Sequence, residues 1–334
     1  MQLFFSFIVP VYNRPVEVQE LLGSFTRMEA QGIDYEIIIV EDGSTETSEH
    51  IVQKFQGKLP LSYYYKDNTG PGLSRNYGME RAIGNYFIIL DSDVLLPSAY
   101  LRSVKQELEK HPIDCFGGAD RAHQDFSPIQ KAINFSMTSF LTTGGIRGKK
   151  STVEKFKPRS FNMGFSREVF IKTGGYAGMA VGEDLDLSLR IAQQGFKTAF
   201  IQRAYVFHKR RIRWTAFCKQ VYKFGMGRPI LDKRYGRFSL FTLFPSCYLL
   251  GLILALILVI LGKPFFMGVY IIYFLLIFVN SSIHYRNLQI GLYSVWASIL
   301  QFICYGSGYL KAFYYVRIRH KQPEEVFPNL FFEK

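Results

Sequence analysis

The sequence predicts an α/β domain with a Rossmann-like, mostly parallel sheet, followed by an α-helical membrane domain. Two observations lead to this prediction. Across residues 1–235, short apolar runs alternate with longer polar stretches of helical character, a pattern typical of sheets whose strands are joined by helices. From residue 238 onward, the chain contains three long stretches without a charged residue. We therefore expect two domains, one folded in water and one in lipid.

The expected strands and helices alternate along the first domain. Its strands are predicted at Phe4–Val11, Glu36–Val40, Leu61–Tyr65 and Tyr86–Leu90, with a later apolar run at Thr198–Phe207. Its helices are predicted at Glu17–Ala30, Ser48–Phe55, Leu73–Ala82 and Ala99–His111. Ligands of such sheets bind beyond the carboxyl ends of the strands. The residues that follow each strand are therefore the first candidates for a functional site.

The membrane domain is expected to cover residues 238–316. The chain is 48% hydrophobic, and each uncharged stretch is near or above the ~20 residues that cross ~30 Å of hydrocarbon. Three buried core helices are the alternative, but the stretches show almost no amphipathic pattern. Whether two or three of them cross stays open, because Pro245 and Ser246 interrupt the first stretch. The stretches are Phe238–Gly262, Pro264–Ile283 and Leu288–Leu310.

Positive charge gathers just before the membrane domain. The net charge is +13, and residues 203–237 contain eleven Lys or Arg and one acid, Asp232. A solvated basic face or a nucleic-acid site would have the same composition. The position favours the positive-inside rule and contact with anionic membrane lipid, so no nucleic acid is expected as a partner. We expect an integral membrane protein whose first domain is cytoplasmic, with a basic, then aromatic tail at residues 317–334.

Several classes of site are disfavoured by the sequence. The four cysteines are widely spaced without a C-x-x-C pair, which argues against a zinc site or a disulfide framework. The glycine-containing loop at residues 68–76 does not match the phosphate-binding loop of ATPases. The uncharged stretches contain no acid, which weakens a proton-coupled transporter.

An acidic pair, Asp91 and Asp93, follows the apolar run that ends at Leu90. Two carboxylates two residues apart can point the same way and share one hard divalent cation, which could bridge a diphosphate. A solvated loop is the ordinary alternative. His208 ends another apolar run, so it could be a further metal ligand or a structural histidine.

Two other strand ends also have candidate binding residues. Pro10 has no N–H group for a sheet ladder and marks the end of the first strand, which would bring Pro10 and Tyr12 against a base. Asn13 suits a turn or a helix cap. Glu41 and Asp42 end the second strand, where a carboxylate could accept hydrogen bonds from a base or ribose, or could cap a helix.

Two helix starts complete the candidate site. Arg75 lies in the first turn after the glycine-containing loop, where it could reach a diphosphate or a base. Glu183 and Asp184 open a later helix, where acids often serve as caps. A carboxylate at this position could instead take a proton from an incoming hydroxyl group.

Taken in order, these segments resemble family 2 glycosyltransferases with the GT-A fold, over residues 3–230. The matching segments are VPVYN, IIIVEDGST, NTGPGLSRNYG, ILDSD, FNMGFSREVF and GEDLDLSLR. The resemblance implies an inverting, metal-dependent enzyme that moves one sugar from a nucleotide-diphosphate sugar, a UDP-sugar, to a hydroxyl group. The implied acceptor is a membrane-associated, lipid-linked glycan in cell-surface polysaccharide or glycoconjugate assembly. The implied location is a bacterial inner (plasma) membrane, with the catalytic domain in the cytoplasm.

The resemblance also implies roles for individual positions. Asp184 matches the catalytic base, with Glu183 beside it. Mn²⁺ or Mg²⁺ would be held by Asp93, Asp91 and His208. The positions implied in nucleotide-sugar binding are Pro10, Tyr12, Asn13, Glu41, Asp42, Gly72, Arg75, Asp91, Ser92, Asn162 and Gly164.

One departure from the family narrows the expected activity. Processive members carry a Q-x-x-R-W motif, whereas here Arg210 stands three residues before Arg213. This favours single addition over polymerisation. Two alternatives stay open: a polyprenyl-phosphate sugar synthase, whose acceptor is already an anion and needs no general base, and a membrane-anchored module that only binds nucleotide-sugars.

Overall fold

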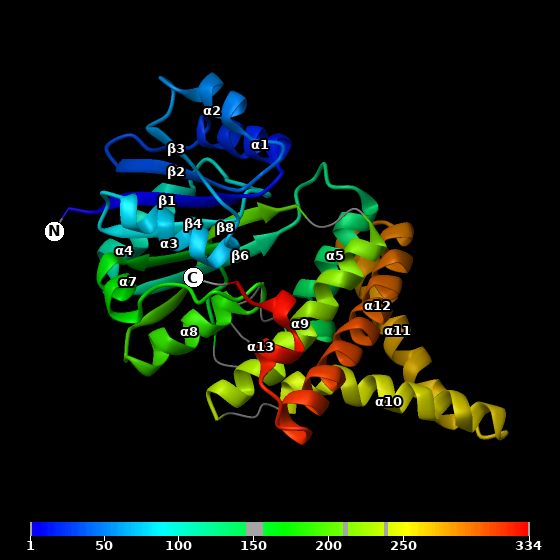
Figure 1. Cartoon of the computed structure of the whole chain (residues 1–334). Helices are drawn as coiled ribbons and strands as arrows, with labels where there is room; N and C mark the ends of the chain where they lie inside the picture. Colours follow the sequence, from blue (N-terminus) through cyan, green and yellow to red (C-terminus); the bar gives the residue numbers. More distant parts are fainter. Residues whose placement is uncertain (1, 145–155, 210–212, 237–239, 333–334) are drawn as a thin grey trace. The chain divides into compact units, whose positions relative to one another are not determined.

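The computed structural model describes residues 2–144, 156–209, 213–236 and 240–332 (Figure 1). The chain divides into two compact units, and the boundary differs from the one expected at residue 235. The first unit contains Met1–His123, Ile146–Lys209 and Asn329–Lys334, and the second contains Gln124–Gly145 and Arg210–Pro328. The last residues of the chain therefore belong to the same unit as its beginning.

The first unit is built on an eight-stranded sheet with the order β3-β2-β1-β4-β7-β6-β8-β5. Only β7 and β5 run antiparallel to their neighbours in the part of the sheet that the structure describes, which confirms the predicted mostly parallel sheet. The carboxyl ends of the parallel strands thus share one edge. The strands are β1 (Phe4–Val11), β2 (Asp34–Asp42), β3 (Leu61–Lys66), β4 (Tyr86–Leu90), β5 (Val94–Leu95), β6 (Cys115–Arg121), β7 (Asn162–Ser166) and β8 (Thr198–His208).

Helices cover both faces of this sheet. Side chains alternate along a strand, so Phe7 of β1 lies in a core with residues of α1, α2 and α4, whereas Ile8 lies in a core with residues of α3, α7 and α8. The helices of the first unit are α1 (Pro15–Phe25), α2 (Glu49–Phe55), α3 (Pro71–Arg81), α4 (Tyr100–Lys110), α7 (Arg167–Thr173) and α8 (Glu183–Gln193).

Two helices begin earlier than predicted, and a proline explains each difference. Pro15 and Pro71 start α1 and α3. Proline suits the first helical position because its missing N–H has no partner there and its φ angle is already helical. Helix α1 also ends at Phe25, earlier than the predicted Ala30, and a turn with Gly32 at a φ of +70° precedes β2.

The second unit is helical. Three segments are long and apolar enough to cross a membrane, namely Thr242–Ile260, Phe265–Tyr285 and Leu288–Ile318, in agreement with the expected membrane helices. Helices α5 and α6, from the middle of the chain, were not predicted. The elements of this unit are α5 (Pro128–Thr138), α6 (Phe140–Thr143), α9 (Trp214–Arg234), α10 (Leu240–Ile260), α11 (Phe265–Tyr285), α12 (Leu288–Phe313), a π-helical turn (Tyr314–Ile318) and α13 (Pro323–Val326).

Small residues let the helices of the second unit approach closely. A Cβ atom on Gly225 of α9 would overlap the carbonyl of Tyr305 in α12, and one on Gly308 would overlap the carbonyl of Tyr222. Between α11 and α12, the hydroxyl groups of two serines are hydrogen-bonded at 2.6 Å. Close backbone packing and hydroxyl pairs of this kind are typical of helix association in lipid.

Candidate active site

An acidic cluster lies at the carboxyl edge of the sheet. Possible ligand atoms of Asp91, Asp93 and His208 lie within 4.8 Å of one another. The short strand β5 explains the arrangement, because its antiparallel pairing sets Val94 opposite His208 and so brings Asp93 beside the imidazole. Carboxylate and imidazole donors in this spacing fit a divalent cation such as Mn²⁺ or Mg²⁺.

Two arginines face these acids. Arg14 donates to Oδ2 of Asp93 at 2.6 Å, while Arg75 donates to Oδ1 of Asp91 at 2.8 Å and to Oε1 of Glu183 at 3.0 Å. Arg75 is buried, and its guanidinium group also lies 5.1 Å from the centre of the Tyr176 ring. Arg14 was not predicted as a site residue: it lies three residues after the end of β1, and no local pattern marks it.

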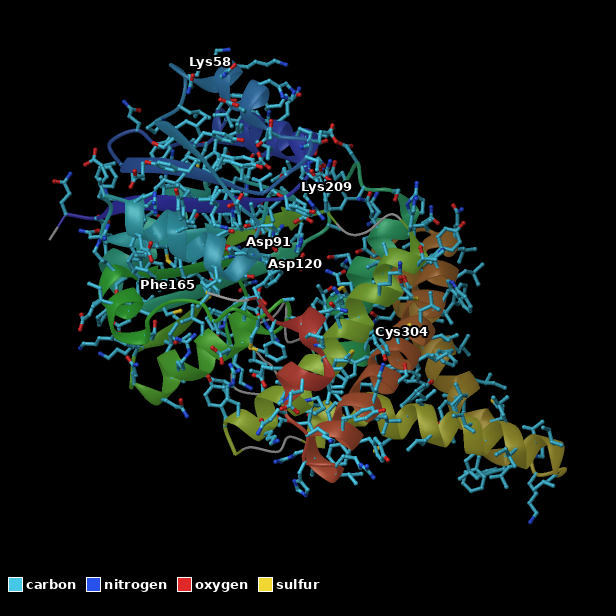
Figure 2. The ribbon with its side chains drawn as sticks, viewed as in Figure 1. Lys58, Asp91, Asp120, Phe165, Lys209 and Cys304 are labelled. Carbon is cyan, nitrogen blue, oxygen red and sulfur yellow. The ribbon has the colours of Figure 1, made fainter. Side chains whose placement is uncertain are left out.

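Asp120 is a second residue that the sequence reasoning missed. It lies in β6 and is labelled in Figure 2. Its Oδ2 atom is 3.6 Å from Nδ1 of His208, whose Nε2 atom is 3.2 Å from Oδ1 of Asp93. The ring of Phe161 stacks on the imidazole at 5.1 Å. A carboxylate on one imidazole nitrogen leaves the other directed at a metal, an arrangement common around metal-bound histidines.

Glu183 and Asp184 lie at the start of α8, as predicted. Burial and the nearby charge of Asp184 raise the pKa of Glu183 to about 7, although Arg75 acts in the opposite direction. Asp184 is half-buried, and its Oδ1 atom accepts hydrogen bonds from the Leu185 N–H at 2.7 Å and from Arg159 at 3.3 Å. The two acids therefore differ in environment, and Asp184 is the more accessible.

The end of β1 presents an aromatic surface. Tyr12 is 52% exposed, directly after the strand in which Pro10 pairs with Val40 of β2. Asn13 does not cap α1. It has a φ of +53°, and its Oδ1 atom accepts backbone N–H groups of Thr45 and Glu46 at 2.9 Å, so it joins the loops after β1 and β2.

The two acids at the end of β2 are occupied by their own loops. Glu41 is fully buried and accepts hydrogen bonds from both the N–H and the hydroxyl group of Ser48. Asp42 is also buried; it accepts from Lys66 at 2.6 Å and from the N–H of Gly70 at 2.9 Å. Both acids therefore shape their own loops in this structure, and their part in binding a base or ribose stays a prediction.

Asn162 and Gly164 lie in β7, inside the sheet. Asn162 is fully buried, accepts from the Tyr100 hydroxyl group at 2.6 Å and donates to the Ala204 carbonyl at 2.7 Å. A Cβ atom on Gly164 would overlap the ring of Phe116. Both residues therefore have roles in sheet packing, and their contact with a nucleotide-sugar stays a prediction.

The remaining predicted positions lie close to the acidic cluster. A Cβ atom on Gly72 would stand 2.8 Å from the Ala177 carbonyl, so this glycine lets α3 approach the segment before α8. Ser92 is buried between the two acids. Lys209 donates its N–H to the Asp93 carbonyl at 2.8 Å. Residues 210–212, which include Arg210 of the departing motif and part of the basic segment, lie outside the described residues.

The chain resembles known proteins mainly in its first part. A profile of glycosyl transferase family 2 matches residues 6–174. The chain is 32% identical over 112 residues to poly(ribitol-phosphate) beta-N-acetylglucosaminyltransferase TarS of Staphylococcus aureus, a match covering 33% of this chain and 20% of that protein. It is 30% identical over 101 residues to validoxylamine A glucosyltransferase of Streptomyces hygroscopicus subsp. limoneus, covering 30% of this chain and 22% of that protein. The matched part is thus about a fifth of the length of these relatives.

A solved structure shares the fold along most of the chain. Mannosyltransferase PcManGT from Pyrobaculum calidifontis, in complex with GDP-Man and Mn²⁺, superposes with a TM-score of 0.57 at 14% sequence identity. The match covers 93% of this chain and 88% of that chain. At this identity, the similarity is one of fold.

Proposed function

The chain belongs to glycosyl transferase family 2, and from this premise we propose that it is an inverting, metal-dependent glycosyltransferase that adds a single sugar. The donor is a nucleotide-diphosphate sugar, with UDP-sugar as the first candidate, and the acceptor is a hydroxyl group of a lipid-linked glycan in cell-surface assembly. The observation that carries the proposal is the cluster of Asp91, Asp93 and His208, which Arg75 links to Glu183 at the start of α8.

The leaving group is a diphosphate, and the site offers positive charge for it. Asp91, Asp93 and His208 would hold Mn²⁺ or Mg²⁺, which neutralises charge on the departing diphosphate. Arg75 is held by two acids and stays fixed by them, so it adds a preorganised charge at low reorganisation cost. The exposed ring of Tyr12 gives the base a surface at the end of β1.

The second half of the reaction needs a base for the acceptor. Asp184 takes the proton of the acceptor hydroxyl group on its carboxylate while the oxygen forms a bond to the anomeric carbon. The bond from that carbon to the phosphate oxygen breaks, and its electron pair leaves with the nucleoside diphosphate. Attack from the opposite face inverts the anomeric centre in one displacement. Glu183 orients Arg75 through the 3.0 Å ion pair.

The membrane helices suggest where the acceptor is found. The described basic residues before α10, such as Lys219, Lys223 and Arg228, favour a cytoplasmic location of the catalytic unit and contact with anionic lipid. An inner-membrane protein oriented in this way would meet lipid-linked acceptors at the cytoplasmic leaflet. No nucleic acid takes part in this proposal.

A donor screen tests the proposed function. Purified full-length protein in detergent is supplied with each donor and a membrane extract, and release of UDP or GDP is measured with and without EDTA. We expect release with one class of donor, its loss on chelation, and its loss in Asp184→Asn. A polyprenyl-phosphate sugar synthase would keep activity in Asp184→Asn, and no turnover with any donor would indicate a binding module.

A further inference from the structure

The last described residues of the chain return to the first unit and contact its catalytic elements. Residues Leu330–Phe332, called the C-terminal strap here, form an antiparallel bridge in which Phe331 pairs with Met179. The N–H of Phe332 donates to the Gly178 carbonyl and the N–H of Ala180 donates to the Leu330 carbonyl, both at 2.8 Å. The strap therefore adds a short strand to the segment that leads into α8.

Glycines provide the seat for the strap. Gly70, the residue before α3, has a φ of +85°, and a Cβ atom there would overlap the ring of Phe332. A Cβ atom on Gly178 would stand 2.6 Å from the Phe332 carbonyl oxygen. The ring thus rests on the backbone where α3 begins, and the main chain rests on the segment before α8.

The two elements touched by the strap are the ones that meet in the site. The side chain of Asn76 in α3 accepts the Tyr176 N–H at 2.8 Å and donates to the Tyr176 carbonyl at 2.9 Å. One residue earlier in α3, Arg75 pairs with Glu183 at 3.0 Å. The strap therefore contacts the backbone on both sides of this ion pair, namely the start of α3, which contains Arg75, and the segment that leads to Glu183.

We propose that the C-terminal strap is a positioning element of the active site, with Phe332 as its positioning residue. Segment Tyr176–Gly182 has no helix and only an isolated bridge in the described structure, and its backbone is tied mainly at its ends and by the strap. Weakly tied segments of this kind open locally at low free-energy cost. By clamping the segment against α3, the strap keeps Glu183 and Asp184 in register with Arg75.

Hydrogen exchange on the full-length protein tests the clamp without any substrate. In Phe332→Ala, we expect amides of residues 177–182 to exchange about 10-fold faster, because the ring no longer holds the strap on Gly70. Gly178→Ala, which pushes on the strap from the other side, should have the same effect. Phe331→Ala is the matched control. The bridge between Phe331 and Met179 uses main-chain atoms, so the amides of residues 177–182 should exchange in this variant at the rate of the parent protein. Unchanged exchange in both Phe332→Ala and Gly178→Ala would overturn the proposal.

Steady-state kinetics test the consequence for catalysis, which rests on the proposed function. Phe332→Ala should lower kcat about 10-fold while the donor KM changes less than twofold, and Phe332→Leu should recover part of the loss. If Phe332 had only a structural role, the substitution would lower the thermal midpoint and the fraction of active protein, without a selective loss of kcat in the active fraction. An unchanged kcat would contradict the role of the strap in positioning the site. If no donor is turned over by the parent protein, the proposed function fails, while hydrogen exchange still decides the clamp.

Discussion

Asp93 and the residues around it show which members of the candidate site could be predicted from the sequence. Asp91, Asp93 and His208 could be predicted because each directly follows an apolar run. Arg14 and Asp120 could not, since nothing local marks them. Only the pairing of β5 and β6 with β8 brings His208 between Asp93 and Asp120.

Polar residues in a recognisable motif can also stabilise the fold. Glu41 and Asn162 have the residue types that bind nucleotides, yet their polar atoms are bound to the protein's own loops and strands. Which partner such a group finds depends on tertiary contacts, so the residue type and its place after or before a strand do not decide it.

Asp93→Ala should lower turnover by on the order of 100-fold or more, because it removes a carboxylate from the proposed metal site. Mn²⁺ binding, measured by calorimetry, should weaken in parallel. Asp34→Asn is a suitable control, because Asp34 begins β2 at the opposite edge of the sheet. Normal turnover of Asp93→Ala in the presence of a chelator would refute the metal-dependent mechanism.

Glu183 should give the protein a pH-dependent stability. Its pKa is raised from an ordinary value near 4.5 to about 7, chiefly by burial. Below the ordinary value both states hold the proton. As pH rises toward 7, the unfolded chain loses its proton first, so the folded state loses roughly 3 kcal/mol across this window and nothing further above it.

Glu183→Gln removes this titration. We expect the thermal midpoint of the parent to fall between pH 5 and pH 8 relative to that of the variant, measured by scanning fluorimetry in detergent. The difference between the two slopes of thermal midpoint against pH removes the contribution of the other carboxylates, because both proteins contain them. Parallel curves would show that the pKa of Glu183 is not raised.

Short and irregular elements set the limit of prediction at the scale of strands and helices. Long apolar runs such as β1 and β4 were predicted with their observed bounds. Strand β5 has two residues and no periodicity to detect, yet its pairing with β8 brings His208 to the acidic pair. Strand β7 was not among the predicted strands, because its packing against β4 and β6 is not visible in its own residues.

Gly164→Ala tests the structural role of β7. The added methyl group would overlap the Phe116 ring in the middle of the sheet, so we expect a loss of about 1–3 kcal/mol in the free energy of unfolding. The donor KM should stay within twofold of the parent value in protein that folds. A raised donor KM with unchanged thermal stability would instead indicate that Gly164 contacts the nucleotide-sugar.

At the scale of the whole molecule, composition separated the long apolar helices from the sheet but did not place the unit boundary. The three apolar segments lie where predicted. Residues 124–145 and α9 were assigned to the first domain because they are not apolar enough to suggest lipid. Their packing with α12, partly through Gly225, is a tertiary property.

Sidedness of the chain can be measured by labelling single cysteines, in a cysteine-free background, with an impermeant maleimide. Lys58 and Glu324 are exposed residues on either side of the apolar helices in sequence. We expect Lys58→Cys and Glu324→Cys to react from the same face of the membrane, because the strap that follows Glu324 belongs to the first unit. Reaction from opposite faces would contradict the contact between the strap and residues 178–180.

That return of the chain to its starting unit restricts how it threads the bilayer. A path that leaves one compartment and finishes in the same one makes an even number of passages, whereas three apolar helices are available. In the most apolar stretch of each helix, only 11% of α10 and 17% of α11 are buried against other parts of the protein, compared with 39% of α12. We therefore expect two of the three apolar helices to traverse the lipid, and the less buried pair, α10 and α11, to do so as a hairpin that turns at Lys263.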